Sequence, residues 1–256
     1  MTALEQVLTL LNQNLLHGFA VFLRVSAIVA MLPAFGEQSV PVRIKLAVAV
    51  AFTAIVAPAV PLGAQIGSLT DLIFLTFTEA ASGLLIGIGV RLLVIALQIA
   101  GSIAAQSTSL SQVLGGAAVD PIPAMGYILV VGGLALATLA GLHVKATGFI
   151  VLSYDFLPFG RFVEPSAISE WGTHQVAKAF SLAFSLAAPF IVLSVLYNFA
   201  LGAINRAMPQ LMVAFVGAPV TTLGGLALLM ISAPFMLEVW LEALNRFMLD
   251  PFGGRQ

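Results

Sequence analysis

Long stretches without Asp, Glu, Lys or Arg dominate the chain. Five such runs lie at residues 46–70, 92–119, 121–144, 179–205 and 207–237. Each exceeds the roughly 20 apolar residues that a helix needs to cross a bilayer. A sixth apolar stretch, around residues 7–35, is interrupted by Arg24; Glu5 stands where a cleavable signal would carry Lys or Arg, so we expect this stretch to be retained. The pattern predicts about six long membrane helices.

Proline and glycine mark the ends of the first helices. Residues 32–36 close the first helix, and Pro41 opens the second, since proline is tolerated in a first helical turn. Residues 58–63 end the second helix. Thr70 or Asp71 is the candidate cap of the third helix, which the pattern extends toward Gly115. More than forty residues is too long for one plain span. Gly101 and the Gly115–Gly116 pair are natural places for a break, so we expect a bent or broken helix.

The second half of the chain predicts three more helices. The first runs from about Ala124 to Leu152, and a polar loop follows over residues 154–173. The last two helices lie near residues 175–205 and 211–247. The predicted fold class is therefore an all-α integral membrane protein, with about six long hydrophobic helices arranged as hairpins, some of them broken. We expect residues 1–256 to form a single membrane domain.

Composition supports the membrane setting and excludes several functions. Only 8% of residues are charged and 60% are hydrophobic, with a mean hydropathy of +1.08, whereas soluble domains are roughly a quarter charged. The absence of cysteine excludes disulfides and thiol chemistry. The sequence has no phosphate loop, HExxH pair or nucleophile elbow, and His17, His143 and His174 are scattered. We therefore expect no enzyme activity, no catalytic or metal-binding residue and no cofactor. A net charge of −1 also argues against nucleic-acid binding, which needs a strongly basic surface.

The distribution of Lys and Arg does not fix a membrane orientation. With six spans, one set of tails and loops carries four basic residues and the opposite set carries three. The positive-inside rule needs a clear excess on one side. The four are Arg161, Lys178, Arg246 and Arg255, and the three are Arg43, Lys45 and Arg206. Helices longer than a single span, together with an even distribution of Lys and Arg, indicate that partner proteins hold the chain in its position in the membrane.

An uncharged polar stripe lies in the middle of the chain. Between Leu92 and Val119 there is no charged residue, yet serines, threonine and glutamines are frequent. On a helix, Gln98, Ser102, Ala105, Ser109 and Gln112 share one face. Such groups are costly in lipid. Two interpretations stay open: the stripe lines a water-filled pore, or it hydrogen-bonds neighbouring helices, as membrane serines and glutamines often do.

Charges inside the apolar runs need partners or water. Glu79 and Arg91 are twelve residues apart, about 18 Å along a helix, so they do not pair with each other. Each either reaches water near a helix end or meets another helix. Arg24 is expected to form a structural ion pair between helices. The spacing of Gly83 and Gly87 indicates a close approach by a second helix.

Three blocks of residues resemble one known family. The first runs from Arg24 to Pro33 and continues through Phe35, Gly36, Val40, Pro41, Arg43 and Lys45. The second includes Glu79, Gly83, Gly87, Ala100, Gly101, Ala105 and Gln106 and leads into Asp120 and Pro121. The third is residues 205–210 followed by Gly217, Ala218 and Pro219. In order and length these blocks are similar to the FliR family, the export-gate subunits of flagellar type III secretion.

The resemblance implies a role and partners. In that family one copy of the subunit joins several copies of FliP and FliQ in a helical, pore-forming assembly, with FlhB and FlhA as further partners. The assembly exports unfolded flagellar proteins and lies in the bacterial inner (cell) membrane, at the flagellar basal body. Two alternatives stay open: the corresponding subunit of a virulence-type injectisome, and a stand-alone secondary transporter with its site along the polar stripe.

The resemblance also implies site residues. The family's pore plug corresponds to a loop at about 106–121, which overlaps the polar stripe. Its residues are Gln106, Ser107, Thr108, Ser109, Leu110, Ser111, Gln112, Gly115, Gly116, Asp120 and Pro121. The candidate subunit-interface residues are Arg24, Pro33, Pro41, Arg43, Glu79, Gly83, Gly87, Arg91, Arg206, Pro209, Gln210, Gly217 and Pro219. Residues 205–210 could equally form a simple turn with Arg206 near a helix C-terminus, where a cation is favoured.

Overall fold

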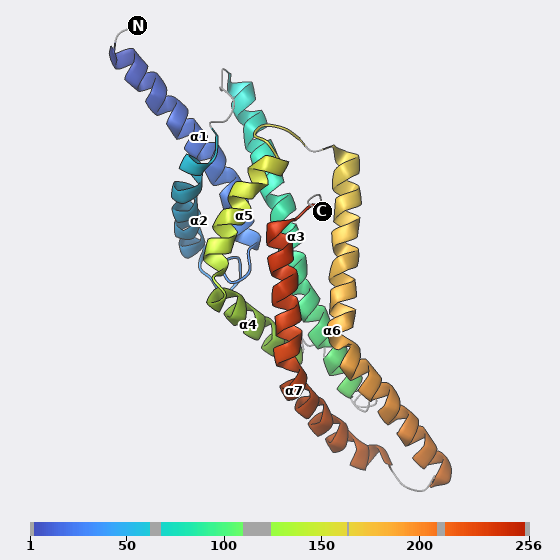
Figure 1. Cartoon of the computed structure of the whole chain (residues 1–256). Coiled ribbons are helices and arrows are strands. Elements are labelled where there is room, and N and C mark those ends of the chain that lie inside the picture. The colour runs from blue at the N-terminus through green and yellow to red at the C-terminus, as the bar shows by residue number, and fades with distance from the viewer. Residues whose placement is uncertain (1–2, 62–67, 110–123, 163, 209–212, 254–256) are drawn as a thin grey trace. The chain divides into compact units, whose positions relative to one another are not determined.

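The computed structural model describes residues 3–61, 68–109, 124–162, 164–208 and 213–253. These residues form helices and short connections, with no strand among them (Figure 1). The elements are α1 (Ala3–Met31), α2 (Val42–Val56), η1 (Ala57–Ala59), α3 (Leu69–Ser109), α4 (Ala124–Leu139), α5 (Leu142–Phe156), α6 (Pro165–Ala207) and α7 (Val213–Leu249). The all-α prediction is confirmed.

The described helices are long and apolar enough to span a membrane several times. Five of them qualify as spans by length and hydropathy, or six if α4 and α5 together make one bent span. α3 has 41 residues, α6 has 43 and α7 has 37. At 1.5 Å per residue these helices are about 55–65 Å long, roughly twice the hydrocarbon thickness. The protein is a multi-pass membrane protein, as the apolar runs predict.

α3 begins two or three residues earlier than expected and does not break at Gly101. The Ser68 hydroxyl accepts a hydrogen bond from the Asp71 N–H at 3.2 Å, and the Asp71 carboxylate accepts one from the Ser68 N–H at 3.0 Å. This reciprocal pair is a capping box, so Ser68 and not Thr70 or Asp71 is the cap. The break expected at Gly101 is wrong, because the helix continues to Ser109. The Gly115–Gly116 pair lies outside the described residues.

Two other expectations in the second half are wrong. The helix predicted over residues 124–152 is divided at Gly141, whose φ of 80° is left-handed and open to glycine without strain. The polar loop predicted over 154–173 is mostly helical, since α5 continues to Phe156 and α6 begins at Pro165. Proline at the first position of a helix is favourable, because its missing N–H has no partner there in any case.

The chain divides into two compact units. Unit one comprises Met1–Arg91, Ala137–His174 and Leu244–Gln256, and unit two comprises Leu92–Leu136 and Gln175–Ala243. The core of unit one includes Val25, Ile28, Ile86, Leu142 and Phe149. The core of unit two includes Leu97, Leu129, Leu186, Phe190 and Trp240. α3, α4, α6 and α7 each contribute residues to both units.

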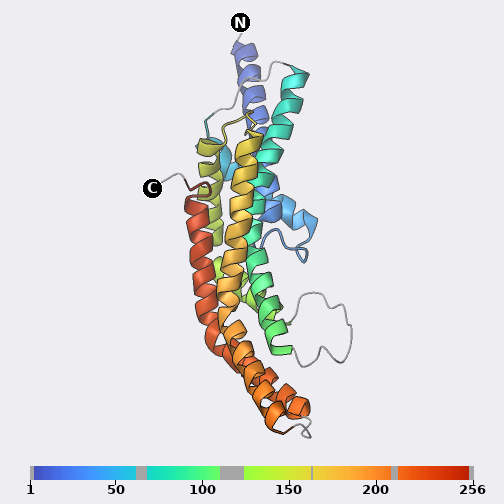
Figure 2. The ribbon, with the colours of Figure 1, turned by 90° about the vertical axis from the view of Figure 1, so that its right-hand side faces the viewer.

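In unit one, α1 lies beside the first half of α3 (Figure 2). A methyl group added at Gly83 would lie 2.5 Å from the carbonyl oxygen of Arg24 and 2.8 Å from the Cβ of Ala27. One added at Gly87 would lie 2.9 Å from the Cβ of Met31. The small-xxx-small pattern therefore permits a close helix contact, which confirms that prediction.

Candidate functional site

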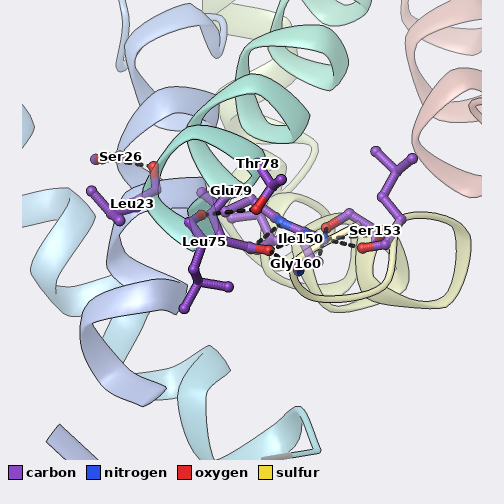
Figure 3. Close-up of polar contacts among 10 residues, drawn as sticks. Leu23, Ser26, Leu75, Thr78, Glu79, Ile150, Ser153 and Gly160 are labelled. Atoms are coloured by element: carbon purple, nitrogen blue, oxygen red, sulfur yellow. Dashed lines mark hydrogen bonds and ion pairs between the residues drawn. The ribbon is translucent and has the colours of Figure 1, made fainter. Parts of the chain in front are cut away.

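Arg24 of α1 and Glu79 of α3 form a buried ion pair in unit one. Figure 3 shows Glu79 with Ser153 and Gly160, which lie near the pair. The Nε of Arg24 donates to Oε2 of Glu79 at 2.8 Å, and Nη2 donates to Oε1 at 3.1 Å. Both side chains are 0% exposed. Two parallel hydrogen bonds between a guanidinium and a carboxylate make the strongest common form of ion pair. The expectation that Arg24 pairs between helices is confirmed.

The pair also holds the connection that follows α5. Nη1 of Arg24 donates to the carbonyl oxygen of Leu157 at 2.7 Å and to that of Ser153 at 3.3 Å. Glu79 Oε1 accepts a hydrogen bond from the Gly160 N–H at 3.2 Å. Carbonyls at a helix C-terminus lack partners within the helix, so a cation is well placed there. The ion pair thereby joins α1, α3 and the end of α5.

Aromatic rings cover the guanidinium. The Arg24 Cζ lies 3.8 Å from the centroid of the Tyr154 ring and 5.7 Å from that of Phe159. The two rings are themselves in contact, with centroids 4.5 Å apart. A cation over an aromatic face gains attraction from the ring quadrupole, more so when water is excluded. This enclosure is typical of an ion pair with a structural role. Glu79 does not reach water, so that alternative is wrong.

A second ion pair in unit one is more open. Nη1 of Arg91 lies 2.6 Å from Oε1 of Glu37, and the two side chains are 26% and 19% exposed. Arg91 therefore meets a residue of the α1–α2 connection. Nearby, Lys45 donates to the carbonyl oxygen of Gly36 at 2.9 Å. These two bonds stabilise the connection between α1 and α2, which contains Pro33 and Gly36.

Arg91→Ala is expected to destabilise the protein by only about 1 kcal/mol, because partly exposed ion pairs contribute little. Thermal unfolding of the purified protein in detergent would measure this, with the exposed Arg161→Ala as the matched control. An effect of Arg91→Ala as large as that of Arg24→Ala would contradict the difference in burial. The expectation that Arg91 lies at a subunit interface stays a prediction.

In unit two, the two faces of α3 differ in burial. Leu97, Gly101, Ala104 and Thr108 recur at helical spacing and are buried against the unit's own residues. On another face, Gln98, Ser102 and Ala105 are half-buried and Gln106 is exposed. The described part of the polar stripe therefore points away from the core of unit two. Ser109 ends α3, and Gln112 lies outside the described residues.

The predicted plug residues fall partly on the helix. Positions 106–109 form the last turn of α3, so the expectation of a loop is wrong for these four residues. In this turn the Thr108 hydroxyl donates to the carbonyls of Ala104 and Ala105, at 3.3 and 3.0 Å, and its side chain is buried. The other predicted plug residues lie outside the described residues, namely Leu110, Ser111, Gln112, Gly115, Gly116, Asp120 and Pro121.

The predicted interface residues are placed in several settings. Four already have close contacts within unit one, namely Arg24, Glu79, Gly83 and Gly87. Pro33 is buried, whereas Pro41 and Arg43 at the start of α2 are exposed. Arg206 is exposed in the last turn of α6, as expected of a cation there. Gly217 and Pro219 belong to α7, and Pro209 and Gln210 lie outside the described residues. Their contact with other subunits stays a prediction.

Several residues that stabilise the interior of each unit were not identified from the sequence. Glu37 was not singled out as the partner of Arg91, nor were Tyr154 and Phe159 as the cover of Arg24. In unit two, the indole N–H of the fully buried Trp240 donates to the carbonyl oxygen of Leu93 at 2.7 Å. A lone tryptophan in an apolar run is a usable signal, since a buried indole N–H needs an acceptor.

The fold and these sites define a class. Long apolar helices, an ion pair enclosed between them and an uncharged polar helix face belong to a polytopic α-helical membrane protein. The family described as bacterial export proteins, family 1, matches residues 15–247 of this chain. The chain therefore belongs to this family, whose members include the flagellar biosynthetic protein FliR.

Relatives support the same assignment over nearly the whole length. The chain is 35% identical to the flagellar biosynthetic protein FliR of Caulobacter vibrioides over 239 residues, which cover 91% of this chain and 94% of the relative. It is 30% identical to that of Escherichia coli, covering 94% and 93%. It is 26% identical to that of Bacillus subtilis, covering 78% and 79%. The family prediction made from the three residue blocks is confirmed.

Proposed function

We propose that this protein is a non-enzymatic subunit of the flagellar type III export gate and forms part of the pore for unfolded flagellar proteins. The observation that carries the proposal is the polar face of α3 in unit two. Gln98, Ser102 and Gln106 point away from the unit's own core, on the part of α3 that contains no charged residue. Polar groups left facing lipid are costly, so water or another protein is the expected neighbour.

The chemistry of this face suits the passage of an unfolded chain. Residues 92–119 contain no charged side chain. An unfolded substrate carries both charges and apolar groups, so fixed charges in a channel would hold some segments and repel others. Neutral amides and hydroxyls interact weakly with each kind of segment. Within the proposal, residues 106–121 supply the plug, which extends from the last turn of α3.

The outer surface of unit two supports the assignment of protein partners. Large apolar side chains on α6 and α7 are more than half exposed in the isolated chain, among them Phe180, Phe184, Leu196, Phe199, Leu223, Met230, Ile231 and Phe235. Lipid or the helices of other subunits must cover them. The proposed neighbours are FliP and FliQ, with one copy of this chain per complex, and FlhB and FlhA beside them. The proposed location is the bacterial inner membrane, in the flagellar basal body.

Native mass spectrometry after gentle detergent extraction tests the proposal. A tagged copy of the full chain, extracted from its own membrane, should come out in a large complex with one copy of itself and several copies of two other small membrane proteins. A stable monomer or homodimer would refute the gate assignment and favour a stand-alone transporter. A gate complex that also contains virulence-system subunits would assign the chain to an injectisome, although the relatives named above are flagellar proteins.

A further inference from the structure

Two glycine contacts fix the buried face of α3 in unit two. A methyl group added at Gly101 would clash with the Cα of Gly126 and lie 2.6 Å from its backbone nitrogen. The two backbones, of α3 and α4, therefore touch directly. Two turns farther along, Thr108 packs against Gly225 of α7, where an added methyl group would clash with the Thr108 Cγ2 and lie 3.0 Å from its Cβ. Neither contact has space for one more carbon atom.

Both contacts lie on the same side of α3. Gly101 and Thr108 are seven residues apart, about 10 Å along the axis and nearly in register around it. Ser102 follows Gly101 directly and so lies about 100° around the helix from it. Two fixed points on one side of a helix determine both its rotation and its height. They therefore also determine where Gln98, Ser102 and Gln106 point.

We propose that Gly101 and Gly225 are positioning residues that hold the polar face of α3 toward the pore. This assignment rests on the proposed function, because it takes that face to be the pore lining. The two glycines do not touch the substrate. They act by fixing the rotation of α3. α7 takes part because its Gly225 leaves the space that the Thr108 side chain occupies. A residue with a Cβ at either position would rotate or lift α3 and turn the polar face.

The test uses cysteine labelling, which the chain permits because it has no cysteine of its own. Ser102→Cys in the assembled complex reports whether the polar face reaches water, through its rate of reaction with a membrane-impermeant maleimide. Leu97→Cys, on the buried face, is the reference for an inaccessible position. We expect Ser102→Cys to react and Leu97→Cys to stay unreactive.

Neighbouring glycines of α7 then give a matched pair of variants. Gly225→Ala meets Thr108, whereas Gly224→Ala points into open space. Both replace a helical glycine by alanine, so their effects on helix propensity are alike. We expect Gly225→Ala to change the reaction rate of Ser102→Cys by about tenfold, because overpacking displaces the helix. Gly224→Ala should leave the rate unchanged. Thr108→Ala, which removes the Cγ2, should restore much of the rate in the Gly225→Ala background.

Each outcome decides a different statement. If Ser102→Cys does not react in the otherwise natural complex, the pore-lining face and with it the proposed function are wrong. If Ser102→Cys reacts but Gly225→Ala and Gly224→Ala behave alike, the positioning assignment is wrong and the proposed function stands. If Gly225→Ala does not assemble, Thr108→Ala alone loosens the same contact and should also shift the rate. An unchanged rate there overturns the assignment.

Discussion

Glu79→Ala is expected to destabilise the protein by about 3–5 kcal/mol, because it leaves the Arg24 guanidinium charged, enclosed and without its carboxylate. Arg24→Ala should have an effect of similar size, because it leaves the Glu79 carboxylate buried with the Gly160 N–H as its one remaining donor among the described residues. Arg24→Ala also frees the Leu157 carbonyl, so in that variant the connection after α5 loses its anchor. The damage should begin in unit one.

Tryptophan fluorescence can locate this damage. The chain has two tryptophans, and Trp171 belongs to unit one whereas Trp240 belongs to unit two. In a Trp240→Phe background, thermal unfolding in detergent therefore reports on Trp171 and unit one. Glu79→Ala should lower the melting temperature by roughly 10 °C, given 2–4 °C per kcal/mol for chains of about this size. Asp155→Ala, which removes an exposed carboxylate of the same unit, is the control and should have little effect.

A double variant separates a buried ion pair from simple packing. Arg24→Met with Glu79→Leu removes both charges and keeps most of the volume, and such replacements are often far less harmful than the loss of one partner. The double variant should melt above either single variant. It should remain below the natural protein, since Arg24 also donates to the Leu157 carbonyl and contacts the Tyr154 ring. A double variant no better than the worse single one would show that the two charges do not compensate each other.

The sequence predicts the spans well because the bilayer imposes a simple rule. A helix that crosses hydrocarbon carries few charges, so the charge-free runs mark most of the spans, although α1 contains Arg24 and α3 contains Glu79 and Arg91. The end of α1 before residues 32–36 and the start of α2 after Pro41 follow from proline and glycine, and the structure confirms both. The Gly83–Gly87 contact is also predictable, since the spacing places both glycines on one face.

Glycine explains the main errors in the helices. Its missing Cβ serves either a turn or a close contact, and the sequence does not say which. Gly101 was expected to break α3, yet it lets the backbone of α4 touch an unbroken helix. Gly141 was expected inside a helix, yet it adopts a left-handed conformation that divides α4 from α5. Deciding between these uses requires knowing which other helix is near.

The partners of the buried charges were not predictable for a similar reason. Arg24 and Glu79 are 55 residues apart, and Arg24 and Leu157 are 133 apart. A charge within an apolar run shows that a partner is needed, so the expectation of an ion pair for Arg24 was sound. The identity of that partner depends on which helices lie side by side. The alternative in which Glu79 reaches water failed because Glu79 is fully enclosed in the middle of such a contact.

Deletion of residues 110–116 is expected to leave the gate complex assembled while raising its ion conductance, by roughly tenfold or more where a pore constriction is lost. The deletion begins after Ser109 so that α3 stays whole and Thr108 keeps its contact with Gly225. Conductance of the purified complex in a planar bilayer is the direct measurement. Recovery of the complex by the same tag shows whether assembly is intact.

The deletion distinguishes a plug from a mere connection between α3 and α4. If residues 110–116 seal the pore, shortening this segment removes material from the channel, and the leak appears without loss of partners. Replacing the same seven residues by glycine and serine keeps the length, so a leak there would assign the seal to side chains and not to chain length. Unchanged conductance of an assembled deletion complex would refute the plug. The polar face of α3, tested separately by labelling at Ser102, would then stand as the only pore lining contributed by this part of the chain.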